Sequence, residues 1–129
     1  MRACYLDTSC LVAIAFGEEG AVGHGRRLEA CSPILSANLL EAEFRSALAR
    51  EGVADDGSLL LASVSWILPD RRLTAEIERV LVVGHARGAD LWHLACALYA
   101  AESPADLPFF TVDARQRELA AALGFPTPV

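Results

Sequence analysis

The sequence predicts an α/β fold: a three-layer α/β/α sandwich with a central, mostly parallel sheet of four to five short strands. Short apolar stretches alternate along the chain with segments of helical periodicity. This alternation is typical of parallel strands joined by helices that cover both faces of the sheet. The 129 residues, of which 53% are hydrophobic, fit one domain over residues 1–129 with a core of its own.

The individual elements follow from local patterns. Residues 2–6 form an apolar run that predicts the first strand, and residues 8–16 form a helical stretch that begins with hydroxyl side chains. Asn38 is a favourable first residue for a helix that continues to Glu51. Further helices are predicted at 21–30, 55–64, 74–85, 91–99 and 115–123, and further strands at 34–35, 66–68, 109–112 and near residue 125.

Acidic residues directly follow two of the predicted strands. Asp7 follows the first strand and Asp113 a later one, so both are expected at the carboxyl edge of the sheet, where ligands of parallel sheets bind. Asp90 begins a helix and Glu43 lies inside another, and both have routes to this edge. Each Asp alone also fits a helix N-cap. Glu41 has Arg45 four residues further on and can form an ion pair with it. Glu43 has no such neighbour, so it needs a partner from elsewhere in the fold.

Four carboxylates at one edge repel one another, so a cation is expected among them. Since all the candidate ligands are oxygens, the expected ion is Mg²⁺ or Mn²⁺. Zinc is not expected, because the three histidines lack the spacing of zinc ligands. One of them, His93, comes one turn after Asp90 and could orient it, but a single histidine on an amphipathic helix is interpreted as structural.

Composition excludes several classes of protein. The net charge of −6 argues against a broad basic face for nucleic acid. All eleven basic residues are arginine, and the absence of lysine excludes P-loop ATPases, Schiff-base enzymes and receiver domains. No apolar run approaches the roughly 18 residues of a membrane span. With no export signal recognised, a cytoplasmic location is expected, with four reduced cysteines: Cys4, Cys10, Cys31 and Cys96.

Four segments resemble, in order, the motifs of the PIN-domain family, and within it the VapC-type toxin ribonucleases of bacterial toxin–antitoxin pairs. The segments are YLDTSCLVAIAF, EFRSALAR, GADLWHLACAL and FFTVDARQRELAAALGF. The resemblance covers essentially the whole chain and selects four acids, Asp7, Glu43, Asp90 and Asp113. Trp92, beside the third acid, departs from the family pattern, in which smaller residues are common at this position.

The resemblance implies a PIN-like fold and a Mg²⁺-dependent endoribonuclease that acts as the toxin of a type II, VapBC-like system. It implies that Asp7, Asp90 and Asp113 hold the metal, which activates water to cleave RNA. Glu43 would hold a second ion or orient that water. Near these acids in the sequence are residues expected to fix carboxylate orientations, Ser9 and Thr111, and candidate contacts to RNA phosphates, Arg87, Arg115 and Arg117.

The expected partners are RNA, a cognate antitoxin that inserts an arginine into the acid cluster, and a second copy of the chain. The homodimer is expected because the chain has more apolar residues than one core needs. Those expected to face solvent include Leu59, Leu60, Leu61, Trp66 and Ile67. The alternative function is a catalytically weak PIN-fold binding module that acts through protein–protein interaction. Metal-dependent degradation of RNA distinguishes the two.

Overall fold

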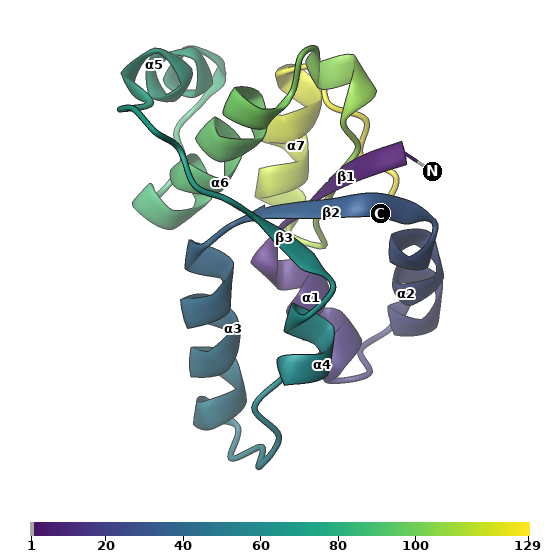
Figure 1. The fold of residues 1–129 in the computed structure, drawn as a ribbon. Coiled ribbons are helices and arrows are strands. Elements are labelled where there is room, and N and C mark those ends of the chain that lie inside the picture. The colour runs from purple at the N-terminus through teal and green to yellow at the C-terminus, as the bar shows by residue number, and fades with distance from the viewer. Residues whose placement is uncertain (1) are drawn as a thin grey trace.

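A computed structural model describes residues 2–129 of the protein (Figure 1). The first part of the chain contains β1 (Arg2–Leu6), α1 (Thr8–Ala15), α2 (Ala21–Glu29), β2 (Cys31–Ala37), α3 (Leu39–Arg50), α4 (Ser58–Leu61) and β3 (Val64–Ile67). The second part contains α5 (Thr74–Val83), α6 (Gly88–Ala100), the 3₁₀ helix η1 (Pro104–Asp106), β4 (Phe109–Phe110) and α7 (Ala114–Ala122).

The four strands form one sheet in the order β3-β2-β1-β4, and every pair of neighbours is parallel. β1 therefore lies inside the sheet, between β2 and the short β4. The predicted α/β class and parallel sheet are confirmed. Because the strands all run in one direction, their carboxyl ends lie along one edge.

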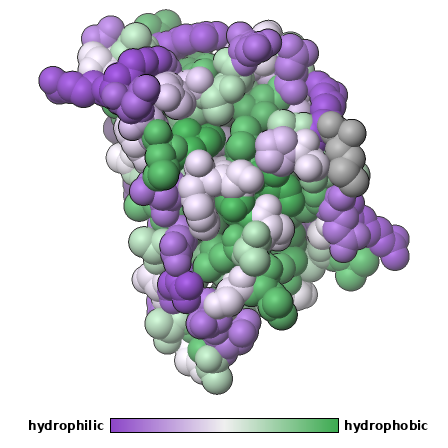
Figure 2. Space-filling model, viewed as in Figure 1, coloured by the Kyte–Doolittle hydropathy of each residue, from purple (hydrophilic) through white to green (hydrophobic). Residues whose placement is uncertain are grey.

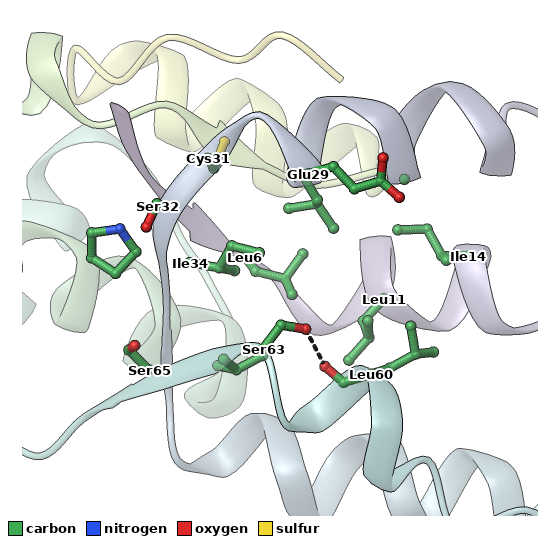
Figure 3. A pocket seen from close by; sticks show the side chains of 14 residues that line it. Leu6, Leu11, Ile14, Glu29, Cys31, Ser32, Ile34, Leu60, Ser63 and Ser65 are labelled. Atoms are coloured by element: carbon green, nitrogen blue, oxygen red, sulfur yellow. Dashed lines mark hydrogen bonds between the residues drawn. The ribbon is translucent and has the colours of Figure 1, made fainter. Parts of the chain in front are cut away.

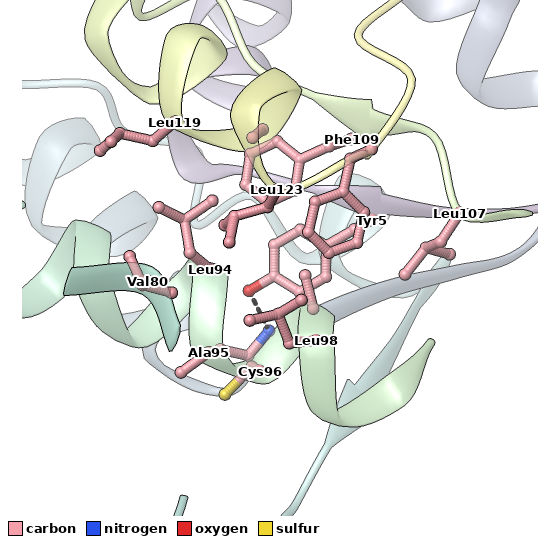
Figure 4. Packing of buried hydrophobic residues seen from close by; sticks show 14 of the residues in the cluster. Tyr5, Val80, Leu94, Ala95, Cys96, Leu98, Leu107, Phe109, Leu119 and Leu123 are labelled. Atoms are coloured by element: carbon pink, nitrogen blue, oxygen red, sulfur yellow. Dashed lines mark hydrogen bonds between the residues drawn. The ribbon is translucent and has the colours of Figure 1, made fainter. Parts of the chain in front are cut away.

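Side chains of β1 alternate between two apolar layers, as the geometry of a strand requires. Cys4 and Leu6 pack with α1, α2, α3 and α4 on one face of the sheet. Tyr5 points to the other face, where α5, α6 and α7 cover the sheet. Figure 4 shows Tyr5 within this second layer, next to Phe109 and near Leu94 and Leu98. Both faces of the sheet are thus covered by helices, which is the predicted sandwich.

Several predicted boundaries were wrong. The helix expected at 55–64 is only Ser58–Leu61, because Gly57 adopts a left-handed conformation immediately before it, with φ of 75°. The following strand begins at Val64, earlier than expected, and the second strand extends over Cys31–Ala37. Near Phe125 there is no strand. Only one backbone hydrogen bond joins the tail to β4, from the Phe109 N–H to the Pro126 carbonyl at 2.8 Å.

The start of α6 also differs from the prediction. This helix begins at Gly88, so Asp90 lies in its first turn and does not cap it. Asn38 precedes α3 as expected, but its side chain makes no capping hydrogen bond. The four cysteines are free thiols, as predicted, and Cys4 and Cys96 are fully buried.

The apolar residues expected at the surface differ in burial. Leu60 and Trp66 are half-buried against the core. Leu59 is 92% exposed, whereas Leu61 and Ile67 are buried in the two apolar layers and are corrections to the prediction. Other exposed apolar side chains lie after β3 and on α5, namely Leu68, Leu81, Val82 and Val83. Figure 2 shows apolar surface across the middle of the face seen in Figure 1, with hydrophilic residues around its margin. Within residues 2–129, no helix combines the length and apolar character needed to cross a bilayer.

Candidate active site

Asp7 lies at the carboxyl end of β1 and is 3% exposed. Two hydroxyl groups donate hydrogen bonds to its Oδ2 atom, Ser9 Oγ at 2.7 Å and Thr111 Oγ1 at 2.8 Å. Backbone N–H groups of the loop after β4 donate in turn to these hydroxyls, Val112 to Ser9 at 3.1 Å and Asp113 to Thr111 at 3.2 Å. The orientation of the Asp7 carboxylate is thus determined by a network that joins the ends of β1 and β4.

Glu43 projects from α3 and is held through its Oε1 atom. Thr8 Oγ1 donates a hydrogen bond to this oxygen at 2.8 Å, and His93 Nε2 lies 2.7 Å from it. Burial acts to raise the pKa of Glu43, but the hydrogen bonds from His93 and Thr8 outweigh burial and hold this pKa below its ordinary value. Glu43 is therefore a carboxylate at neutral pH.

Asp90 is half-buried in the first turn of α6, and its side chain makes no hydrogen bond within residues 2–129. The Gln116 side chain donates to its backbone carbonyl at 3.0 Å, which ties α6 to α7. Burial raises the pKa of Asp90, and the negative charges of Asp7 and Asp113 raise it further. These acids are therefore close enough for their mutual repulsion to matter.

Asp113 caps α7, as the sequence predicted. Its Oδ1 atom accepts a hydrogen bond from the Gln116 N–H at 2.8 Å. The residue is exposed, and it belongs both to the cap and to the wall of the acidic cavity. Asp113 therefore caps α7 and at the same time lines the cavity, so the cap does not exclude a role in the site.

One cavity of about 520 Å³ brings the four predicted acids together. Its lining also includes residues that the sequence interpretation did not assign to the site: Thr8, Glu18, Arg50 and His93. Within residues 2–129, no three Asp, Glu, His or Cys side chains are close enough together to surround one ion as they stand. The donor set still fits a hard divalent cation, because it consists of carboxylate oxygens. Burial, and then the charges of Asp7 and Asp113, raise the pKa of Asp90, a cost that a cation would offset.

His93 was interpreted as structural, with orientation of Asp90 as the alternative, and its side chain does not contact Asp90. Its ring contacts Glu43 instead, since Tyr5 Oη holds the other ring nitrogen, Nδ1, at 2.7 Å. The sequence signal for His93 was its position one turn after Asp90 on the same helix. Nothing local could show that α3 and α6, from opposite faces of the sheet, meet at this point.

Two of the three predicted arginines lie beside the acids. Arg87 and Arg115 line an adjoining cavity of about 450 Å³ that shares Asp90 and Asp113 with the acidic one. Arg117 is directed elsewhere: its guanidinium donates to the Val129 carbonyl at 2.8 Å and to the Thr111 carbonyl at 3.1 Å. Arg117 is half-buried in these contacts and lines neither cavity, so it is removed from the set of candidate RNA contacts. Arg115 also bonds protein groups, Glu118 and the His85 carbonyl, but it is exposed and lines the adjoining cavity.

A third cavity, of about 560 Å³, lies apart from the acids between α1, α2, α4 and the adjacent strands (Figure 3). Its lining is mainly aliphatic, with Leu6, Leu11 and Ile14 directed into it and Glu29 as its one acidic residue within the described chain. A single carboxylate and an apolar wall do not provide ligands for a cation. The chemistry is therefore concentrated at the carboxyl ends of the strands.

A comparison with known protein families agrees with the fold and with the acid-lined edge of the sheet. The PIN domain matches residues 4–122, and the chain belongs to this family. Membership supports a nuclease-type hydrolase that uses a divalent metal such as Mg²⁺ or Mn²⁺. No curated protein matches the chain.

Proposed function

We propose that the protein is a Mg²⁺-dependent endoribonuclease and the toxin of a type II, VapBC-like toxin–antitoxin pair. The observation that carries this proposal is the convergence of four carboxylates, from four separate parts of a PIN domain, on one cavity. Asp7, Asp90 and Asp113 would hold Mg²⁺ or Mn²⁺. The chemistry that such a cation supplies is Lewis-acid stabilisation of the negative charge that develops on a phosphodiester during hydrolysis.

The chain's own residues have separate tasks in this proposal. Ser9 and Thr111 donate to Asp7 Oδ2, which leaves Oδ1 for the cavity. Glu43 remains ionised and uses its free Oε2 to orient the attacking water or to hold a second ion. Water is positioned for attack on phosphorus, and the 3′ oxygen of the preceding nucleotide leaves.

Arginines around the acids would bind the phosphates that flank the cleaved bond. Arg87 and Arg115 are exposed and line the adjoining cavity, while Arg50 lines the acidic one. A guanidinium group makes paired hydrogen bonds to phosphate oxygens. This local positive charge supports RNA binding by a chain whose net charge is −6.

The proposed partners are an antitoxin and a second copy of the chain. An antitoxin tail with an arginine would match the acid-lined cavity, because a guanidinium pairs well with carboxylates and would compete with the metal. Leu68, 67% exposed, and Val82, 86% exposed, provide apolar surface that supports a homodimer. Co-expression with the protein encoded beside this one, followed by affinity purification, tests the toxin role independently of the chemistry.

Incubation of the purified protein with a structured RNA tests the enzymatic proposal. We expect Mg²⁺-dependent internal cleavage that EDTA stops and added Mg²⁺ restores. Sequencing the 5′ ends of the fragments would then identify the cleavage site. RNA binding without cleavage at any Mg²⁺ or Mn²⁺ concentration would contradict the nuclease proposal and favour the binding-module alternative.

A further inference from the structure

A buried chain of polar side chains leads from the core of the protein to the acid-lined cavity. Tyr5 Oη lies 2.7 Å from His93 Nδ1, and His93 Nε2 lies 2.7 Å from Glu43 Oε1. Tyr5 and His93 are 0% and 1% exposed. Glu43 and one edge of the His93 ring both line the cavity, and of the two side chains Glu43 is the exposed one, at 31% against 1%.

The surroundings of Tyr5 determine the direction of these hydrogen bonds. The Ala37 N–H donates to Tyr5 Oη at 3.1 Å, a bond within the core layer drawn in Figure 4. Among the described residues the phenolic hydrogen then has only His93 Nδ1 as an acceptor, so it is assigned to that bond. A neutral imidazole that accepts at Nδ1 carries its hydrogen on Nε2, so His93 donates to Glu43. Every member of the chain is satisfied in this arrangement, as buried polar groups require.

The same arrangement selects which oxygen of Glu43 is free. His93 and Thr8 both bond Oε1, so within residues 2–129 no hydrogen bond holds Oε2. His93 belongs to α6 and Glu43 to α3, which cover opposite faces of the sheet. His93, from the helices on one face of the sheet, therefore holds the carboxylate of Glu43, from the helices on the other face.

We propose that His93 is a positioning residue for Glu43, held by Tyr5 so that it donates to Oε1 and directs Oε2 into the acid-lined cavity. His93 is 1% exposed, and its Nε2 lies 2.7 Å from Glu43 Oε1 and 3.2 Å from Thr8 Oγ1, so in this proposal it acts on the reaction through Glu43. This inference rests on the proposed nuclease function for its kinetic consequence, but the hydrogen-bond arrangement itself does not depend on that function.

Paired substitutions test the kinetic consequence. Gln at position 93 extends an amide nitrogen to about the place of Nε2, whereas the shorter Asn does not reach it. We expect His93→Asn to lower kcat for RNA cleavage by about 10–100-fold, a typical effect of losing a supporting hydrogen bond. His93→Gln should recover most of this loss, and KM should stay unchanged in both variants because the arginines still bind RNA.

A double-mutant cycle separates positioning from a general structural role. If His93 acts through Glu43, the Asn substitution should cost little further kcat in a Glu43→Gln background. An equal cost in both backgrounds, or a wild-type kcat in the folded His93→Asn variant, would overturn the proposal. Thermal melting of each variant reports whether it folds.

Nitrogen NMR of the His93 ring provides a readout that needs no activity. We expect a hydrogen on Nε2 and none on Nδ1, with the Nε2 signal shifted by Glu43→Gln and unchanged by the matched control Glu41→Gln. A hydrogen on Nδ1 alone would overturn the proposal even in an active enzyme. If the wild type does not cleave RNA, the proposed function is refuted instead. The NMR measurement then still tests whether His93 donates to Glu43.

Discussion

The acid-lined cavity has two unlike halves. Asp7 and Glu43 each accept two side-chain hydrogen bonds on a single oxygen, at 2.7–2.8 Å, from donors that neighbouring elements hold in place. The side chain of Asp90 accepts none within residues 2–129, and Asp113 accepts one from the backbone of its own helix. The fold thus stabilises the carboxylates of the first pair by hydrogen bonds and leaves that of Asp90 without one, close to the charges of Asp7 and Asp113.

This difference shows what the fold provides and what it leaves to a ligand. Hydrogen bonds fix the orientation of Asp7 and Glu43 before any ligand arrives, a form of preorganisation. The raised pKa of Asp90 reports the cost of burying a carboxylate near two others. A divalent cation would remove this cost. Its binding should therefore depend on both halves, while the destabilisation that it relieves should be largest at Asp90.

The largest expected effect comes from the Asp7 half. Asp7→Asn removes a charge while the amide oxygen can still accept from Ser9 and Thr111, so the fold should be retained. We expect RNA cleavage in Mg²⁺ to fall by more than about 100-fold, beyond the usual effect of residues that only support a metal ligand. Glu41→Gln is the matched control, because Glu41 pairs with Arg45 on the surface. Near-normal cleavage by Asp7→Asn would mean that the site is misassigned.

The next effect concerns the arginines beside the second half. In an Asp7→Asn background, which does not cleave, Arg87→Ala with Arg115→Ala should weaken RNA binding. The slope of log affinity against log salt should become shallower by about 1.4 for two lost contacts to single-stranded RNA. Arg26→Ala with Arg27→Ala removes the same charge from exposed positions on α2 and is the control. Equal slopes in the two double variants would exclude Arg87 and Arg115 as contacts to RNA phosphates.

The smallest effect is a gain in stability from the second half. In the presence of EDTA, Asp90→Asn should raise the melting temperature at pH 7 by about 2–4 °C, a small change for a domain of this size. Asp113→Asn should give less, because Asp113 is exposed and caps α7. The check is calorimetry of both variants and the wild type.

The pH dependence of this gain follows from linkage. The folded-state pKa of Asp90 lies above its unfolded value, so the native state binds more protons in the interval between them. Wild-type stability therefore falls as pH rises through that interval, and the advantage of Asp90→Asn is complete only above it. The advantage should vanish below about pH 4, where the carboxyl is protonated in both states. A gain that persists at low pH would exclude repulsion as its cause.

Much of the site could be predicted from local sequence. Asp7 and Asp113 directly follow apolar strands, and parallel strands bring such positions to one edge. Glu43 could be distinguished from Glu41 because only the latter has a partner four residues on, and the Glu41–Arg45 ion pair is present at 2.9 Å. The alternation of strands and helices was enough for the class of the fold and for the order of its elements as far as α7, but not for the tail, where the strand expected near Phe125 is absent.

The parts that could not be predicted depend on contacts distant in sequence. The bond between His93 and Glu43 joins residues of two helices on opposite faces, and no periodicity within either helix encodes it. Arg117 looked like a phosphate contact because it follows Asp113, but the C-terminal carbonyl of Val129 takes its guanidinium. The apolar residues at 59–61 gave no sign that Leu61 is buried while Leu59 is exposed, since their surroundings come from other elements.

Direct titration of Mn²⁺ into the purified protein, without nucleic acid, tests the central claim that the four acids form a divalent cation site. We predict saturable binding at neutral pH in the wild type and an affinity at least about 10-fold lower in Asp7→Asn and in Asp90→Asn. Glu41→Gln should bind as the wild type does. Equal affinity in the wild type and in Asp7→Asn, or no binding to a wild-type protein that cleaves RNA, would contradict the account.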